Sequence, residues 1–271
     1  MANWKHFYLI RIEFLGFRYH GWQKQEGFRS VNGMIDKTLL FILGHDDFRT
    51  LGCGRTDAKV SANDYAFELF LNEPALPEQL LHRLNKNLPS DIRAKSVEEV
   101  SAEFNIIQSP KCKEYRYYFS SGEKSHPFNA PLIRDFGKQL DVDQMKAAAL
   151  VFNGTHNFKR YVSKPSEDTV FEREVLHSSI EQNDHLFGSF SPPTSYFFRV
   201  ISKGFMRYQV RLMMGALVEV GRGSWSLEDL KESLSNPNGD QIKHVAPSSG
   251  LVLYRVEFEN TTTIRQKNSP S

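Results

Sequence analysis

The stretch "LGCGRTDAKV" (Leu51–Val60) places two glycines, an arginine and an aspartate between two runs that read as strands. The flanking residues 48–53 and 65–71 have the apolar and aromatic content that is typical of strands. The stretch is therefore expected to be a tight connection between two strands. Its chemistry would lie in Arg55 and Asp57.

Two interpretations of this connection stay open on spacing alone. In the first it is an ordinary turn, in which glycine supplies a positive φ and Asp or Thr bonds its own backbone. In the second the glycines let a substrate approach, and Arg55 stabilises the negative charge of Asp57 in a binding site. The stretch is not a dinucleotide-binding fingerprint, because Asp57 stands where the third glycine would be.

The composition limits the class of protein. The chain has 271 residues, of which 40% are hydrophobic and 24% charged, as in soluble globular proteins. A net charge of +2 gives no general attraction to nucleic acid, so a basic binding surface would have to be local. Cys53 and Cys112 are the only cysteines, which suits a reducing cytosol. Since no apolar run approaches the length of a membrane span, a cytoplasmic protein is expected.

The remaining pattern predicts helices between runs of strands. Helices are expected over residues 31–43, 77–87, 141–152 (ending at Gly154), 208–220 and 227–234. Further strands are expected over residues 6–14, 92–100, 115–120, 173–181, 196–202 and 251–258. Because helices do not follow every strand, the pattern favours an α+β fold with a mixed, mainly antiparallel central sheet flanked by helices.

Two series of elements indicate two lobes around a cleft. The N-terminal lobe is expected over residues 1–105 and carries the Asp57 connection. The C-terminal lobe, over residues 106–260, would complete the active-site cleft. Residues 261–271 are expected to form a flexible tail.

Two segments interleave cations with aromatic rings, and a third is similar. They are "KCKEYRYYF" (Lys111–Phe119), "KGFMRYQVR" (Lys203–Arg211) and "FLGFRYHGWQKQ" (Phe14–Gln25). A ring can stack on a base while a neighbouring Lys or Arg binds phosphate, so the segments together favour RNA binding. The alternative for each one alone is a strand whose rings fill the core while its charges face solvent. The nine histidines show no spacing typical of metal ligands.

Six segments, in the same order, resemble the tRNA pseudouridine synthases of the TruA type. They are "YHGWQKQ" (Tyr19–Gln25), "GRTDAKVSA" (Gly54–Ala62), "NKNLPSDI" (Asn85–Ile92), "KEYRYYF" (Lys113–Phe119), "GFMRYQVRLMMGALVEVG" (Gly204–Gly221) and "APSSGLVLYRV" (Ala246–Val256). One such match would be weak, whereas six in order are specific and cover nearly the whole chain.

The resemblance implies pseudouridine formation in tRNA, with the anticodon stem-loop as the favoured target and no cofactor or metal. The bond between uracil N1 and ribose C1′ breaks, the base turns, and C5 takes the place of N1. Asp57 would be the reacting carboxylate, by addition to base or ribose or through a glycal route, and Arg211 the arginine that pairs with it. Tyr115 would stack on the displaced uracil, and Leu251 would wall the pocket. Arg55 would hold the uridine flipped out of its stack.

The resemblance also bears on RNA binding and assembly. Cations beside the aromatic segments are expected to meet phosphates, namely Lys111, Lys113, Lys203 and Arg207. The family's usual assembly implies a homodimer that jointly holds a tRNA. Four residues depart from the family pattern at positions that the resemblance implies are near the RNA, namely Lys59 (for glycine), Ser61 (for histidine), Asn105 (for histidine) and Ile107 (for arginine).

Three alternatives stay open at this point. The first is the same reaction on another RNA site, and the second is a noncatalytic RNA-binding protein or RNA chaperone on the same fold. The joint presence of Arg55, Asp57, Tyr115 and Arg211 argues against the second. The third is an Asp-dependent hydrolase on an unrelated fold. A glycosidase would need a second carboxylate, and the sequence singles out none as a partner for Asp57.

Overall fold

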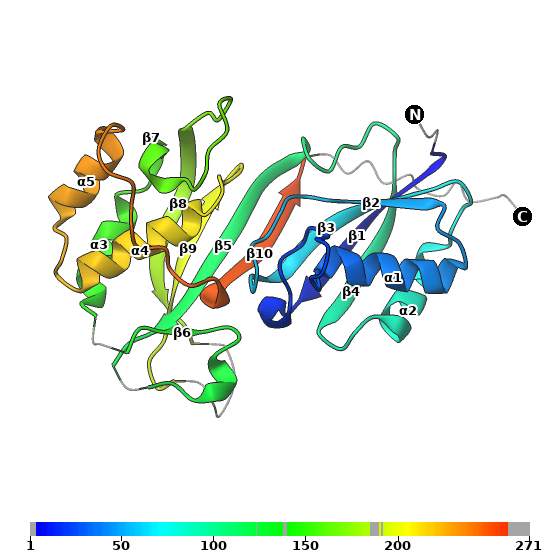
Figure 1. The fold of residues 1–271 in the computed structure, drawn as a ribbon, viewed down its shortest axis with the longest axis horizontal. Coiled ribbons are helices and arrows are strands. Elements are labelled where there is room, and N and C mark those ends of the chain that lie inside the picture. The colour runs from blue at the N-terminus through cyan, green and yellow to red at the C-terminus, as the bar shows by residue number, and fades with distance from the viewer. Residues whose placement is uncertain (1–3, 123, 138–139, 185–189, 191, 260–271) are drawn as a thin grey trace, which may run out of the picture. The chain divides into compact units, whose positions relative to one another are not determined.

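The computed structural model describes residues 4–122, 124–137, 140–184, 190 and 192–259, so the predicted tail at 261–271 lies outside the described residues. The helices are α1 (Val31–Leu43), α2 (Pro77–Asn87), α3 (Val142–Leu150), α4 (Gln209–Gly221) and α5 (Leu227–Ser235). The strands are β1 (His6–Phe14), β2 (Phe48–Gly52), β3 (Ser61–Leu71), β4 (Ile92–Val100), β5 (Pro110–Ser120), β6 (Arg134–Asp135), β7 (Gly154–Asn157), β8 (Glu172–Gln182), β9 (Tyr196–Ser202) and β10 (Leu251–Phe258) (Figure 1).

The described strands form a mixed, ten-stranded sheet. Their order is β4-β1-β3-β10-β5-β9-β8-β7, with β2 paired to β3 and β6 to β5. The ladders β1–β3, β1–β4, β2–β3, β5–β9, β8–β9 and β7–β8 are antiparallel, and β6 runs parallel to β5. The predicted α+β fold, with a mixed and mainly antiparallel sheet flanked by helices, is confirmed.

The chain divides into two compact units, each assembled from separate parts of the sequence. Of the described residues, 4–58, 62–111 and 256–259 belong to the first unit, and 59–61 together with those in 112–255 belong to the second. The three residues after Ala58 are therefore part of the second unit. β10 begins in the second unit and ends in the first.

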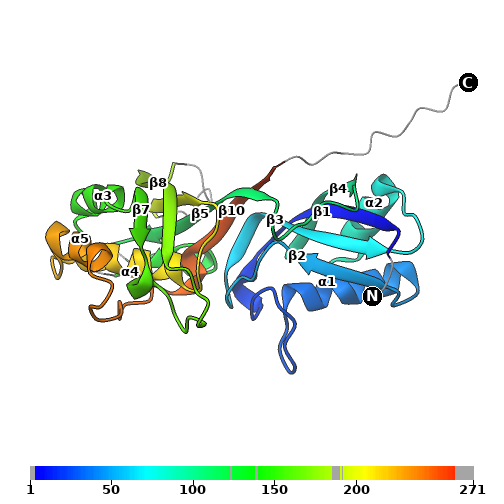
Figure 2. The same ribbon diagram turned by 90° about the horizontal axis from the view of Figure 1, so that it is seen from above.

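The core of the first unit draws on β1 and on its two helices. β1 is buried from Tyr8 to Ile10 and at alternate residues beyond, and α1 and α2 contribute further buried side chains. These core residues are Tyr8, Leu9, Ile10, Ile12, Phe14, Ile35, Leu39, Leu80 and Leu84. α1 begins where the Ser30 hydroxyl accepts a hydrogen bond from the Gly33 N–H, as an N-cap does. Figure 2 shows α1 running alongside β2, and the Asn32 amide donates to the Thr50 hydroxyl at 2.8 Å across that contact.

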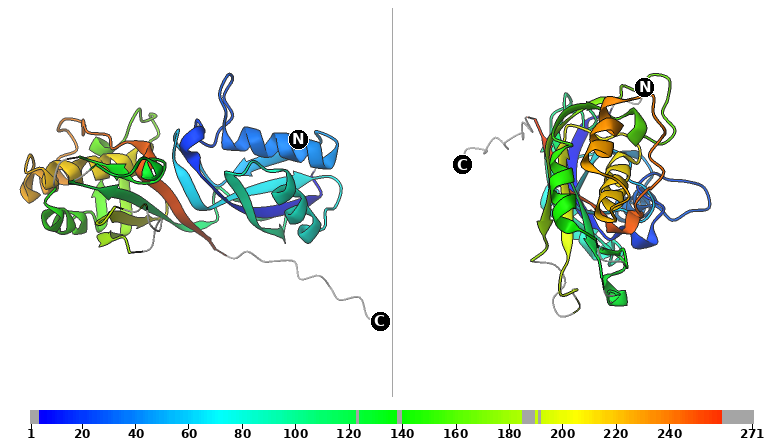
Figure 3. Two further views of the ribbon diagram at one scale, coloured as in Figure 1. Left: turned by 90° about the horizontal axis from the view of Figure 1, so that it is seen from below. Right: turned by 90° about the vertical axis from the view of Figure 1, so that its left-hand side faces the viewer.

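The second unit packs α3, α4 and α5 on its strands. α4 is buried over almost its whole length, and one apolar cluster joins it to Met145 of α3, Leu230 of α5 and Phe198 of β9. The right-hand view of Figure 3 shows α4 and α5 on one side of the strands, in keeping with their direct contact. None of the described helices has the length and apolarity that crossing a membrane requires.

Three expected elements have an end that differs by two residues or more, and the short strands β6 and β7 were not expected. β3 begins at Ser61 and β5 at Pro110, each several residues earlier than expected. α3 ends at Leu150, and Gly154 opens the short strand β7 with a φ of 95°. The expected helix end at Gly154 is therefore wrong, because the positive φ of this glycine serves the entry into a strand.

Candidate functional site

Asp57 lies in the connection between β2 and β3 of the first unit. These strands pair from Phe48↔Leu71 to Gly52↔Phe67, and the Cys53 N–H continues the ladder by donating to the Ala66 carbonyl at 3.0 Å. The base of the connection is thus fixed by backbone hydrogen bonds. Asp57 is half-buried, whereas Arg55 is exposed.

The turn at Gly21 and Trp22 supports this connection by direct backbone contact. The Trp22 N–H donates to the Thr56 carbonyl at 3.4 Å. Gly21 has a φ of 85°, and a Cβ at this position would lie 2.2 Å from the Thr56 carbonyl oxygen and 3.1 Å from the Asp57 carbonyl carbon. Only glycine satisfies both the conformation and the space. This contact brings two of the sequence motifs together, and it holds the backbone that carries Asp57.

Two buried rings support the same backbone. The Trp22 ring stacks on Tyr65 of β3, with centroids 4.2 Å apart and planes at 29°. The Tyr65 hydroxyl donates to the Gly54 carbonyl at 2.5 Å, one residue before Arg55. Sequence reasoning assigned no role to these side chains, although Trp22 lies inside a motif that it had quoted.

Asp91, in the motif Asn85–Ile92, bonds to the start of the motif Tyr19–Gln25. The Asp91 carboxylate accepts from the Tyr19 hydroxyl at 2.7 Å and from the Arg18 guanidinium at 2.9 and 2.6 Å. Burial alone would raise the pKa of Asp91, but the hydrogen bonds from Tyr19 and Arg18 outweigh it and hold this pKa below its ordinary value. The ionised carboxylate therefore fixes the segment that leads into the Gly21 turn.

Lys59 has a left-handed backbone. Its φ is 67°, in the region that favours glycine, and glycine is the residue that the resembled motif has at this position. The Lys59 side chain is exposed, while the next two residues, Val60 and Ser61, are each 2% exposed. Val60 packs in the core of the second unit.

Arg211 is positioned by two groups of the second unit. Its Nε donates to the Ala246 carbonyl at 2.8 Å, and its guanidinium lies 4.4 Å from the centre of the Tyr208 ring. The backbones of Arg211 and Ala246 are also joined, by a 3.1 Å hydrogen bond from the Ala246 N–H. Tyr208 precedes α4 with a φ of 64°. Sequence reasoning missed Tyr208, although the spacing of three residues before Arg211 was a signal for contact on a helix.

The two segments that mix cations and rings meet in the second unit. The half-buried ring of Tyr115 contacts Phe205 edge to face, with centroids 5.3 Å apart. Leu251 is 5% exposed and belongs to the same apolar cluster, against which both rings pack. The other predicted cations differ in exposure: Lys113 is half-buried, and Lys111, Lys203 and Arg207 are exposed.

Strand alternation divides the Lys111–Phe119 segment between two faces of β5. Tyr115 and Tyr117 lie opposite Val200 and Phe198 and pack with the helices, whereas Arg116 lies opposite Arg199 on the other face. The segment is therefore not one continuous aromatic and basic surface. Lys111 and Lys113 share a face of β5 with Tyr115, because they precede it at alternate positions.

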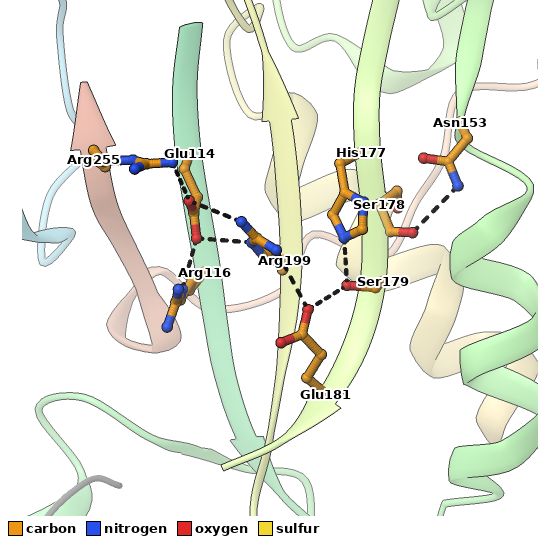
Figure 4. A network of polar contacts seen from close by, with 9 residues as sticks. All are labelled: Glu114, Arg116, Asn153, His177, Ser178, Ser179, Glu181, Arg199 and Arg255. Atoms are coloured by element: carbon orange, nitrogen blue, oxygen red, sulfur yellow. Dashed lines mark hydrogen bonds and ion pairs between the residues drawn. The ribbon is translucent and has the colours of Figure 1, made fainter. Parts of the chain in front are cut away.

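Arg116 belongs to a polar cluster around the buried Glu114. Figure 4 shows Arg116, Arg199 and Arg255 arranged around this carboxylate. Their nearest nitrogens lie 2.8, 3.0 and 3.6 Å from its oxygens. Burial alone would raise the pKa of Glu114, but the hydrogen bonds from Arg199 and Arg116 hold it below its ordinary value. Arg116 therefore has a structural role, as a partner of the buried Glu114.

The departures at Asn105 and Ile107 lie in a turn before β5. The Asn105 side-chain oxygen accepts from the backbone N–H groups of Ile107 and Gln108, at 3.0 and 3.1 Å. Ile106 is fully buried, and Ile107 is 53% exposed. Asn105 therefore acts as a turn-forming residue here.

The predicted site residues divide between the units. Arg55, Asp57 and Lys111 belong to the first unit, and Tyr115, Arg211, Leu251, Lys113, Lys203 and Arg207 belong to the second. Within the part of the chain that the structure describes, no three His, Cys, Asp or Glu side chains gather as a metal site would require.

Comparison with known proteins gives consistent matches. A family model described as tRNA pseudouridine synthase matches residues 148–259. The chain is 32% identical to the tRNA pseudouridine synthase A of Aquifex aeolicus over 250 residues, which are 92% of this chain and 98% of that protein. It is 31% identical over 254 residues to the tRNA pseudouridine synthase A 2 of a Bacillus cereus strain, covering 93% and 100% of the two chains. With the tRNA pseudouridine synthase A of Dictyoglomus thermophilum it shares 31% identity over 264 residues, covering 95% and 100%.

Proposed function

Since this chain belongs to the tRNA pseudouridine synthase family, we propose that it isomerises uridine to pseudouridine in tRNA. The single observation that supports this most is the Asp57 connection. Its backbone is held by Gly21, Trp22 and Tyr65, which is more support than an exposed turn needs. Such support keeps a reacting carboxylate in one position.

The reaction divides into steps that need different groups. The bond between N1 and C1′ breaks, the base turns, a bond forms between C5 and C1′, and the proton on C5 is lost while N1 gains one. Asp57 supplies the carboxylate. Each route named above, by addition to base or ribose or through a glycal, requires one. Tyr115 stacks on the displaced uracil, and Leu251 lines its apolar side. Arg55 binds the flipped-out nucleotide.

Arg211 supplies a fixed cation for the same reaction. Its guanidinium is oriented beforehand by the Ala246 carbonyl and the Tyr208 ring, so it needs little reorganisation when charge develops. The remaining predicted cations serve binding: Lys111, Lys113, Lys203 and Arg207. If they neutralise phosphates, tRNA affinity falls steeply as salt rises, because each contact releases counterions.

The decisive experiment is Asp57→Asn, which keeps the size of the side chain and removes its charge. Tritium release from C5-labelled uridine in tRNA is expected to be almost abolished, while tRNA affinity changes by less than about tenfold. Asp46→Asn, an exposed aspartate before β2, is the matched control and is expected to keep full activity. Release at the wild-type rate by folded Asp57→Asn protein would remove Asp57 from the reaction and leave an ordinary turn.

We extend the proposal to target, assembly and location by family resemblance. The target is the anticodon stem-loop, so replacing its uridines by cytidine in a tRNA transcript is expected to stop tritium release. The active form is a homodimer in the cytoplasm, and light scattering is expected to give twice the 31.2 kDa mass of one chain. A stable monomer that modifies tRNA would refute the assembly, and release from the substituted transcript would refute the target.

A further inference from the structure

Lys59 has a left-handed backbone conformation, which is unfavourable for a residue with a Cβ. Among the described residues, only Lys59, Lys164 and Tyr208 combine a side chain with a positive φ, at 67°, 51° and 64°. A left-handed φ brings Cβ against the following carbonyl, and glycine escapes this because it has no Cβ. Asn and Asp adopt this conformation more readily than lysine, because their short polar side chains bond the local backbone.

The backbone on both sides of Lys59 is fixed. Three residues earlier, the Thr56 carbonyl accepts from Trp22. On the other side, Val60 is buried in an apolar core. The direction in which the Lys59 side chain leaves the chain is therefore set by its surroundings. Since the side chain is exposed, burial of its stem does not offset the strain.

A strained residue of this kind at a reaction site points to a function. Lys59 follows Asp57 by two residues. A uridine whose C1′ reaches Asp57 carries its own two flanking phosphates to this same connection. A lysine ammonium is a compact cation on a long, flexible stem, and phosphate is a ligand that it binds as a point charge.

We propose that Lys59 binds a backbone phosphate next to the target uridine, an inference that rests on the proposed function. The residue acts in substrate binding and leaves the bond-breaking step to Asp57. It thereby converts the position of a turn glycine into an RNA contact. The left-handed backbone sets the direction in which the side chain leaves the chain, and the flexible stem lets the ammonium reach the phosphate.

Two substitutions separate charge from strain. Lys59→Gln removes the charge and keeps a side chain on the strained backbone, whereas Lys59→Gly removes both. Both variants are expected to raise the Kd for tRNA and the KM about three- to tenfold, with kcat changed less than about twofold, and to lower the slope of log Kd against log salt by about one. Lys59→Gly alone is expected to raise the Tm. Lys59→Arg is expected to keep most of the affinity.

Two control variants match these changes elsewhere in the chain. Lys37→Gln removes an exposed charge from α1 and is expected to leave affinity, salt slope and turnover unchanged. Lys164→Gly removes the side chain from the other left-handed lysine and calibrates the gain in Tm. If Lys59→Gln and Lys59→Gly bind tRNA as the wild type does at every salt concentration, the inference is wrong. A loss of kcat at unchanged Kd also overturns it. Wild-type protein that neither binds nor modifies tRNA would instead overturn the proposed function and the inference with it.

Discussion

Gly21→Ala tests whether the turn beside Asp57 is needed in its present form. The substitution adds one methyl group to a residue whose φ is 85°. The new Cβ would lie 2.2 Å from the Thr56 carbonyl oxygen, while ordinary contact begins at 3.4 Å. The two backbones would have to separate by about 1.2 Å (3.4 − 2.2 Å). That movement is applied to the residue directly before Asp57.

The expected loss of stability has two parts. Forcing alanine into a left-handed φ costs about 1 kcal/mol, and displacing packed backbone adds about 1–3 kcal/mol. Gly27→Ala is the matched control, because Gly27 has a φ of 76° in the same stretch but nothing within 4 Å of its Cβ position. Gly27→Ala is therefore expected to lose about 1 kcal/mol and Gly21→Ala about 2–4 kcal/mol in the free energy of unfolding.

The effect on turnover is expected to be larger than the effect on the fold. A shift of about 1 Å in a catalytic group lowers the rate by roughly 10²-fold, so folded Gly21→Ala protein is expected to show such a drop in kcat. Urea unfolding measures the stability of both variants, and tritium release at saturating tRNA measures their turnover. Equal behaviour of Gly21→Ala and Gly27→Ala would refute the claim that this contact positions Asp57.

Three further predictions follow from the polar groups. Glu114→Gln is expected to cost about 2 kcal/mol in urea unfolding, between the values for a buried and an exposed ion pair. Because the pKa of Glu114 lies below its ordinary value, its contribution to stability is lost as the pH falls through and below about 4.5, and the variant is expected to lack that loss. Burial raises the pKa of Glu68 in β3 to about 7, so its ionisation is expected to lower wild-type stability as the pH rises from about 4.5 to 7, and Glu68→Gln is expected to lack that loss of Tm. Tyr208→Phe is expected to keep kcat, because the ring under Arg211 remains, whereas Tyr208→Ala is expected to lower it about tenfold; equal rates for these two variants would remove the ring from the argument.

Local signals predicted the elements whose ends are set by their own residues. α1 begins after Ser30, whose hydroxyl caps it, and α2 begins at Pro77, a residue that suits the first helical turn. β1 and β4 also have their predicted bounds, and in β1 apolar residues alternate with charged ones from Ile10 to its end at Phe14.

Tertiary pairing set the elements that were missed. Asn63 and Asp64 have low strand propensity, yet they lie within β3 because this strand pairs with β1 as far as Ala62↔Phe14. β6 is two residues long and β7 four, too short to show a period. Each exists because a longer strand, β5 or β8, offers it a partner.

The candidate site was also predictable only in its local features. The sequence motifs pointed to the Asp57 connection, since glycine, arginine and aspartate between strands is a local signal. The approach of Gly21 to Thr56 and the left-handed φ of Lys59 depend on backbones brought together by folding. A pattern within one sequence does not show which distant segments come into contact.

The alternation along β5 has a consequence for how this strand can change during evolution. Between Lys113 and Phe119, odd-numbered residues share the face of Tyr115 and even-numbered residues share that of Glu114. Deleting one residue from this span would exchange the two sets, bringing an arginine to the apolar helices and a tyrosine to the buried carboxylate. Single substitutions in this span leave the other residues on their faces, whereas the insertion or deletion of one residue does not. Related chains are therefore expected to differ in β5 by replacement, and to gain or lose residues only beyond its ends.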